Sequence, residues 1–122
     1  LIVDEPTTGL DWVESRQILD YLQRLRRDKG KTIIIITHDM NIVSLYAERV
    51  VVMATGKVVG DGTPQQVFSQ PELMARACLR RPAMADVSVA LWGEVALTPE
   101  AAAARLFAQA RPASHDAEVV IA

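Results

Sequence analysis

Two short apolar runs near the start of the chain have the pattern of strands in a parallel sheet. Residues 1–3 are LIV and lead directly into two adjacent carboxylates, Asp4 and Glu5. Residues 33–36 are four isoleucines, and such an unbroken β-branched run predicts a central parallel strand covered on both faces. Because strands average about five residues, we expect the first run to be the end of a longer strand.

The segment between these runs has the periodicity of a helix. Ile18, Leu22 and Leu25 recur at helical spacing. Asp11 is followed three residues later by a glutamate, which is the pattern of a capping box, and a glycine follows the basic last turn. We predict a helix over about residues 12–28 that joins the two strands in a right-handed crossover, so that both strands end at one edge of the sheet.

The middle of the chain predicts a short helix followed by a β-hairpin. The helix is expected near residues 41–47. Apolar runs at residues 50–53 and 57–59 flank a turn that contains Gly56, and a glycine in such a turn supplies the positive φ that a tight hairpin requires.

Prolines mark the starts of the later helices. Thr63 and Ser69 each lie shortly before a proline and are predicted to begin two short helices. Residues 84–92 fit either a short helix or a strand. Residues 98–104 (TPEAAAA) predict a helix start, and the chain after Pro112 is expected to be frayed.

Composition supports one ordinary domain and a helical appendage. The 122 residues are 50% hydrophobic with a formal net charge of −2, which favours neither disorder nor a nucleic-acid partner. Cys78 is the single cysteine, so an intrachain disulfide is excluded and an idle thiol is expected. We expect no leader, because no basic-plus-apolar pattern occurs, and no apolar run approaches the roughly 18 residues of a membrane span. Residues 1–81 are predicted as one unit and residues 82–122 as an Ala-rich helical extension with a disordered end.

Three short motifs now occur in a fixed order. Residues 1–5 (LIVDE) resemble the end of a Walker B strand, residues 9–11 (GLD) a D-loop, and residues 36–39 (ITHD) the switch-histidine loop of ATP-binding cassette (ABC) ATPases. The resemblance covers about residues 1–80 and continues through residues 60–64 (GDGTP). It implies an α/β fold that is part of a P-loop NTPase, with parallel strands, a crossover helix, a β-hairpin and a helical C-terminal tail.

The resemblance implies a role for four side chains. Asp4 would hold Mg²⁺, Glu5 would polarise the attacking water, and His38 would contact the γ-phosphate of ATP. Asp11 would contact the second ATPase subunit and the nucleotide sites, although its position also suits a helix N-cap, and both roles are compatible. Outside this motif context each acid could be a solvated surface group, and a lone histidine after a strand is more often structural.

The sequence also contains an apparent phosphate-binding motif that we discount. Residues 30–32 (GKT) match the end of a P-loop, but position 25 is Leu25 where the motif requires glycine. They also follow a predicted helix and precede a predicted strand, which is the reverse of the P-loop order. In the ABC family the P-loop and signature motif precede the Walker B strand. We therefore expect this chain to be a C-terminal part that neither binds ATP tightly nor hydrolyses it alone.

The remaining basic and aromatic residues have simpler interpretations. The arginines and lysines of residues 24–31 and 76–81 are interpreted as a helix end and a solvated face. His115 has no partner at ligand spacing. Trp92 and residues 106–107 (LF) are interpreted either as a contact between two ATPase subunits or as a helical appendage packed on its own domain.

The tail is similar to that of one ABC subtype. Residues 79–82 (LRRP) and 97–101 (LTPEA) resemble the energy-coupling factor ATPases of cobalt, nickel or vitamin importers. This implies an ATP-hydrolysing subunit at the cytoplasmic face of the membrane, paired with a second ABC ATPase subunit in a homo- or heterodimer and with an integral membrane transport subunit. The alternatives are a soluble ABC ATPase of DNA repair or translation and a non-catalytic truncated fragment.

Overall fold

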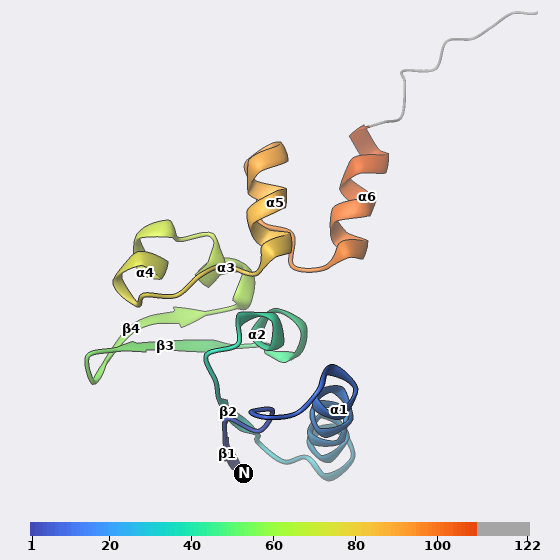
Figure 1. Ribbon diagram of the computed structural model, residues 1–122, viewed down its shortest axis with the longest axis vertical. Helices are drawn as coiled ribbons and strands as arrows, with labels where there is room; N and C mark the ends of the chain where they lie inside the picture. The colour runs from blue at the N-terminus through green and yellow to red at the C-terminus, as the bar shows by residue number, and fades with distance from the viewer. Residues whose placement is uncertain (110–122) are drawn as a thin grey trace, which may run out of the picture.

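A computed structural model describes residues 1–109 as two small sheets and six helices. Figure 1 shows α5 and α6 standing side by side beyond α2 and α3, with α1 at the opposite end of the molecule. The elements are β1 (Ile2–Asp4), α1 (Trp12–Lys29), β2 (Ile34–Ile36), α2 (Met40–Tyr46), β3 (Val50–Ala54), β4 (Lys57–Gly62), α3 (Pro64–Phe68), α4 (Pro71–Arg76), α5 (Ala83–Trp92) and α6 (Pro99–Gln109).

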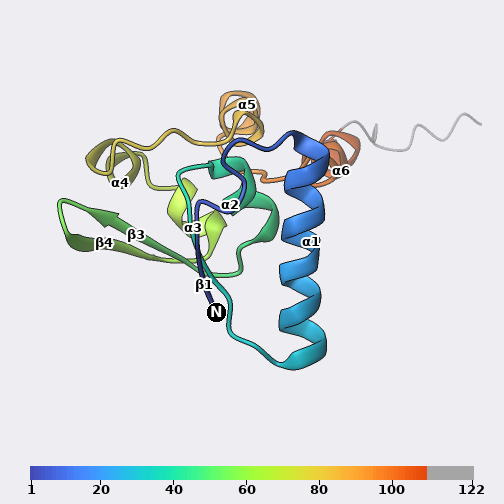
Figure 2. The same ribbon diagram turned by 60° about the horizontal axis from the view of Figure 1, so that its bottom comes forward.

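The first sheet consists of β1 and β2, which pair in parallel with α1 between them in sequence. Ile2 lies opposite Ile34 and Asp4 opposite Ile36. Figure 2 shows the chain running from β1 through the long helix α1 and back to β2. The predicted parallel pairing is confirmed, and both strands end at the same edge.

The prediction that the isoleucine strand is covered on both faces is wrong for the described residues. Ile34 and Ile36 are 50% and 52% exposed, whereas Ile35 between them is half-buried. Successive side chains of a strand point to opposite faces, and no element of residues 1–109 covers the face of Ile34 and Ile36. The strand is also shorter than its apolar run, since β2 begins only at Ile34.

Helix α1 begins and ends where its sequence signals predict. The Asp11 carboxylate accepts a hydrogen bond from the Glu14 amide at 2.8 Å, and the Glu14 side chain accepts one from the Asp11 amide at 3.2 Å. This reciprocal pair is a capping box and satisfies two amides that lack helical partners. At the other end Gly30 adopts φ +59°, the left-handed conformation that suits a helix C-cap.

The second sheet is the antiparallel hairpin of β3 and β4. Its turn contains Thr55 and Gly56 with φ of +49° and +73°. Positive φ at both central residues matches the twist of a tight hairpin, so the predicted hairpin is confirmed. A bidentate ion pair of Arg49 with Asp61, at 2.8 and 2.6 Å, links the two strands near their open end.

The later helices follow the predicted order with one difference in capping. Thr63 is the N-cap of α3, which confirms the predicted start, and it forms a capping box with Gln66 that was not predicted. The N-cap of α4 is Gln70 rather than Ser69, because the Ser69 hydroxyl donates to the carbonyl of Gln65 in the preceding helix. Residues 83–92 form a helix and not a strand, and the predicted frayed end after residue 112 lies outside the described residues.

The hydrophobic core lies between the hairpin and the helices that follow it. Phe68 is fully buried at its centre, with 0% exposure. The other buried members are Val43, Val52, Val67, Leu73, Met74, Ala85 and Val95. The last two come from residues beyond 82, so one core joins both sides of the predicted domain boundary, and the division into two units stays a prediction.

Within residues 1–109, no helix combines the length and the apolar character that a bilayer-spanning helix needs.

Candidate active site

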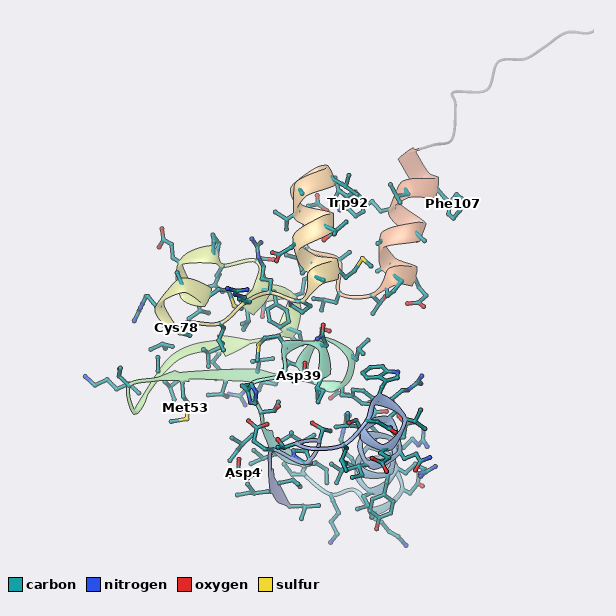
Figure 3. All side chains as sticks on the ribbon, viewed as in Figure 1. Asp4, Asp39, Met53, Cys78, Trp92 and Phe107 are labelled. Carbon is teal, nitrogen blue, oxygen red and sulfur yellow. The ribbon has the colours of Figure 1, made fainter. Side chains whose placement is uncertain are left out.

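The candidate site lies at the edge of the first sheet where β1 and β2 end. The backbone amide of Glu5 donates to the carbonyl of Ile36 at 2.8 Å, which continues the parallel pairing one residue beyond β1. Glu5 therefore lies next to Thr37 and His38, the residues that follow β2. Figure 3 shows Asp4 at the end of β1 and Asp39 where the chain enters α2. The prediction that both strands end at one edge of the sheet is confirmed, and the polar residues that follow each strand meet there.

Three groups of Thr37 and His38 hold the Glu5 carboxylate. Nδ1 of His38 lies 2.6 Å from Oε1 of Glu5, and the His38 backbone amide donates to the same oxygen at 3.2 Å. The Thr37 hydroxyl donates to Oε2 at 3.4 Å. Glu5 also has φ +43°, a conformation that non-glycine residues adopt rarely and that often occurs at functional sites.

The contact between Glu5 and His38 shifts the pKa of both groups. Its hydrogen bond with His38 lowers the pKa of Glu5, because the bond favours the charged carboxylate. The same bond raises the pKa of His38 above its ordinary 6.5, because the carboxylate stabilises the imidazolium. The His38 side chain is 82% exposed and that of Glu5 only 33%. The imidazole therefore faces solvent while the carboxylate lies against the loop.

This pair predicts a specific titration of His38. In Glu5→Gln the His38 pKa is expected to fall towards 6.5, since the amide carries no charge. The stabilisation from His38 is complete below its unfolded pKa of 6.5 and is lost as pH rises through the higher folded value. The stabilisation from Glu5 is complete above its unfolded pKa of 4.5 and is lost as pH falls through the lower folded value. NMR titration of the imidazole measures the shift.

The chain offers a simple control for that titration. It contains two histidines, so a His115→Gln variant assigns the His38 signal without ambiguity. An unchanged His38 pKa in Glu5→Gln would contradict the contact.

Asp4 is the candidate Mg²⁺ ligand and lies exposed at the end of β1. Among residues 1–109 its carboxylate has neither a hydrogen-bond nor an ion-pair partner, and no group of three or more metal-binding side chains occurs there. Mg²⁺ in nucleotide sites typically takes one or two carboxylates and fills its octahedron with water and phosphate oxygens. A single free carboxylate fits one ligand of a nucleotide-bound Mg²⁺, but not a complete protein site.

Asp11 is placed by the capping box of α1. Its carboxylate accepts the Glu14 amide, and within the described residues it contacts neither Glu5 nor His38. The turn between Glu5 and Asp11 is held by backbone bonds from Thr8 to Glu5 and from Leu10 to Thr7, each 3.2 Å. The N-cap role of Asp11 is therefore confirmed, whereas its contact with a second subunit stays a prediction.

Thr37 and Asp39 lie in the motif of residues 36–39, but their hydrogen bonds at the site were not predicted from the sequence. The Thr37 hydroxyl donates to Glu5 and also accepts the Asp39 amide at 3.1 Å. Asp39 caps α2 by accepting the Asn41 amide at 2.9 Å. Two sequence signals were available for them. Thr37 is a hydroxyl residue directly before the histidine, and Asp39 is an aspartate directly before a helix.

The discounted GKT segment lies where the sequence argument placed it. Gly30 is the C-cap of α1, and Lys31 leads towards β2. The phosphate-binding nest of a P-loop instead precedes a helix. These residues do not form that nest.

Comparison with known proteins identifies relatives of most of the chain, although no protein-family model matches it. Energy-coupling factor transporter ATP-binding protein EcfA2 of Ligilactobacillus salivarius is 41% identical over 98 residues, which are 80% of this chain and 34% of that protein. EcfA2 of Methanospirillum hungatei is 41% identical over 81% of this chain and 25% of its own length. EcfA of Methanocaldococcus jannaschii is 47% identical over 71% of this chain and 31% of its own length. The chain thus spans about a third or less of these curated relatives.

Proposed function

We propose that this chain, which is similar in sequence to part of the ATP-binding proteins of energy-coupling factor ABC transporters, carries the water-activating side of an ATP hydrolysis site. The observation that supports this most strongly is the contact between Glu5 and His38, whose Oε1 and Nδ1 atoms lie 2.6 Å apart at the sheet edge beside Asp4. Phosphoryl transfer to water uses one residue that positions the water and a carboxylate that holds Mg²⁺, and Glu5 and Asp4 can fill these roles.

Each residue has a distinct task in the proposed reaction. Glu5 orients the attacking water and accepts its proton. Nδ1 of His38 is engaged with Glu5, which leaves Nε2 of the exposed ring to donate to a γ-phosphate oxygen. Asp4 provides one carboxylate oxygen for Mg²⁺. A Mg²⁺ ion held there with the nucleotide would supply neutralisation of the charge that develops on the phosphate oxygens.

In this proposal, the residues that bind the phosphates of ATP lie outside these 122 residues. The 122 residues contain neither a complete P-loop sequence nor a Ser-Gly-Gly-Gln signature. We therefore expect the chain alone to bind ATP weakly and to lack ATPase activity, and the complete site to require further sequence of the kind present in its longer relatives.

The partners follow from the same assignment. We propose a second ABC ATPase subunit, either a copy or a relative, and an integral membrane transport subunit at the cytoplasmic face of the membrane. Cobalt, nickel or a vitamin is the proposed cargo. A soluble ABC ATPase of DNA repair or translation is less favoured, because the relatives named above are transporter proteins.

A chimera tests the proposal on a complete ATPase. In EcfA2 of L. salivarius the 98 matching residues are replaced by those of this chain, and Mg²⁺-dependent phosphate release is measured. Asp4→Asn is expected to raise the Mg²⁺ concentration for half-maximal rate by at least about tenfold, since even outer-shell changes weaken metal sites by that factor. Asp28→Asn, an exposed acid at the far end of α1, is the control.

Two results would contradict the proposal. One is a folded chimera without Mg²⁺-dependent hydrolysis, which would instead support the non-catalytic alternative. The other is an Asp4→Asn variant with the Mg²⁺ dependence of the control.

A further inference from the structure

Thr37 links the carboxylate of Glu5 to the start of α2 through one hydroxyl. The hydroxyl accepts the backbone amide of Asp39 at 3.1 Å and donates to Oε2 of Glu5 at 3.4 Å. A hydroxyl has one donor hydrogen and two acceptor lone pairs, so both bonds can exist at once. Because one lone pair is taken by the Asp39 amide, the hydroxyl has a restricted orientation when it donates to the carboxylate.

We propose that Thr37 is a positioning residue for Glu5, because its hydroxyl fixes the rotation of the carboxylate. Oε1 of Glu5 then remains in contact with His38, and Oε2 keeps a constant orientation. This inference rests on the proposed function of Glu5. Thr37 acts through Glu5 and touches neither the water nor the nucleotide.

The Glu5 carboxylate needs such an anchor for two reasons. The terminal torsion of a glutamate is broad and two-fold, so one hydrogen-bonded oxygen does not by itself fix the group. The His38 ring on the other oxygen is 82% exposed, and exposed ion pairs are weak because water competes for both partners.

Thr37 is suited to this task by its own surroundings. It is half-buried, and its β-branched side chain has restricted χ1 rotation. Its hydroxyl is further held by the amide of Asp39, the residue that caps α2. The anchor is therefore a stiff side chain attached to a fixed loop.

The chain contains a matched control for this threonine. Thr32 lies shortly before β2, whereas Thr37 lies directly after it. The Thr32 residue is exposed. Within the described residues the hydroxyl of Thr32 makes no hydrogen bond, and only its backbone carbonyl accepts one, from the terminal amino group of Leu1. Replacing Thr32 with valine removes a hydroxyl from the other end of the same strand.

The experiment uses the chimera at saturating Mg²⁺, with the ATP concentration varied from below to above KM. Thr37→Val is expected to lower kcat for ATP hydrolysis about tenfold with an unchanged KM, as the loss of one hydrogen bond to a charged group implies. Thr37→Ser keeps the hydroxyl and is expected to restore kcat to within about twofold. Thr32→Val is expected to leave kcat unchanged. Thermal melts establish that each variant is folded.

A double variant separates an action through Glu5 from a structural effect. In a Glu5→Gln background, Thr37→Val is expected to cause no further loss of single-turnover rate, because the group that it positions is already absent. A further tenfold loss there would assign its effect to α2 and overturn the inference. So would a Thr37→Val chimera with the parent kcat. If Glu5→Gln itself had no effect, the proposed function would fail instead.

Discussion

Replacing Phe68 with alanine is expected to lower the free energy of unfolding of the chain by about 3–5 kcal/mol. Phe68 is fully buried, and it packs among core side chains from the hairpin, from α2 and from the later helices. The truncation removes the transfer free energy of the ring and leaves a cavity that the surrounding side chains fill only in part. Urea denaturation followed by circular dichroism measures the change.

The second phenylalanine of the chain is the control. Phe107 is 75% exposed on α6, and Phe107→Ala is expected to change the free energy of unfolding by no more than about 0.5 kcal/mol. Equal losses in the two variants would show that the core does not lie around Phe68.

Local sequence signals predicted those elements whose ends are decided by local hydrogen bonds. The capping box at Asp11 and the helix start at Thr63 were both predicted and both occur, and Thr63 also forms a capping box that was not predicted. Gly30 and Gly56 take the positive φ that their turns require. In each case the deciding contact lies within a few residues of the signal, so the sequence alone is sufficient.

Burial of the isoleucine strand could not be predicted in the same way. An apolar run indicates that a strand can be covered on both faces, but whether it is covered depends on elements distant in sequence. In residues 1–109 one face of β2 has no such element, and Ile34 and Ile36 are exposed. The cap of α4 differed for another reason, because the Ser69 hydroxyl bonds back to the carbonyl of Gln65, four residues earlier in α3, and does not cap α4.

The sheet edge at which the site lies could be predicted from the sequence, but the hydrogen bonds within the site could not. Parallel strands end on the same side, which brings Glu5 and His38 together. Which atoms meet depends on side-chain torsions that no sequence pattern specifies. Thr37 was missed for this reason. A threonine at a strand end is common, and only the structure shows that its hydroxyl donates a hydrogen bond to the Glu5 carboxylate.

Glu5→Gln is the change with the largest expected effect on activity. In the chimera it is expected to lower the rate of ATP hydrolysis by about 10²- to 10⁴-fold, which is the usual contribution of a positioned general base. Glutamine has nearly the same size and keeps an oxygen towards the loop, but it cannot take the proton of the attacking water. ATP binding is expected to remain, because Glu5 is not proposed to hold the nucleotide.

Glu72→Gln is the matched control for this change. Glu72 is an exposed acid in the first turn of α4, and the substitution alters the same chemical group away from the sheet edge. Its rate of hydrolysis and its ATP affinity are both expected to equal those of the parent chimera.

The single-turnover rate of ATP hydrolysis in the Glu5→Gln chimera, measured with ATP binding on the same preparation, decides whether Glu5 activates the attacking water. The proposed role of Glu5 predicts that bound ATP persists while the rate of phosphate release falls at least about a hundredfold below that of the Glu72→Gln control. Bound ATP that is hydrolysed at the parent rate would show that Glu5 does not activate the water, and would contradict the claim.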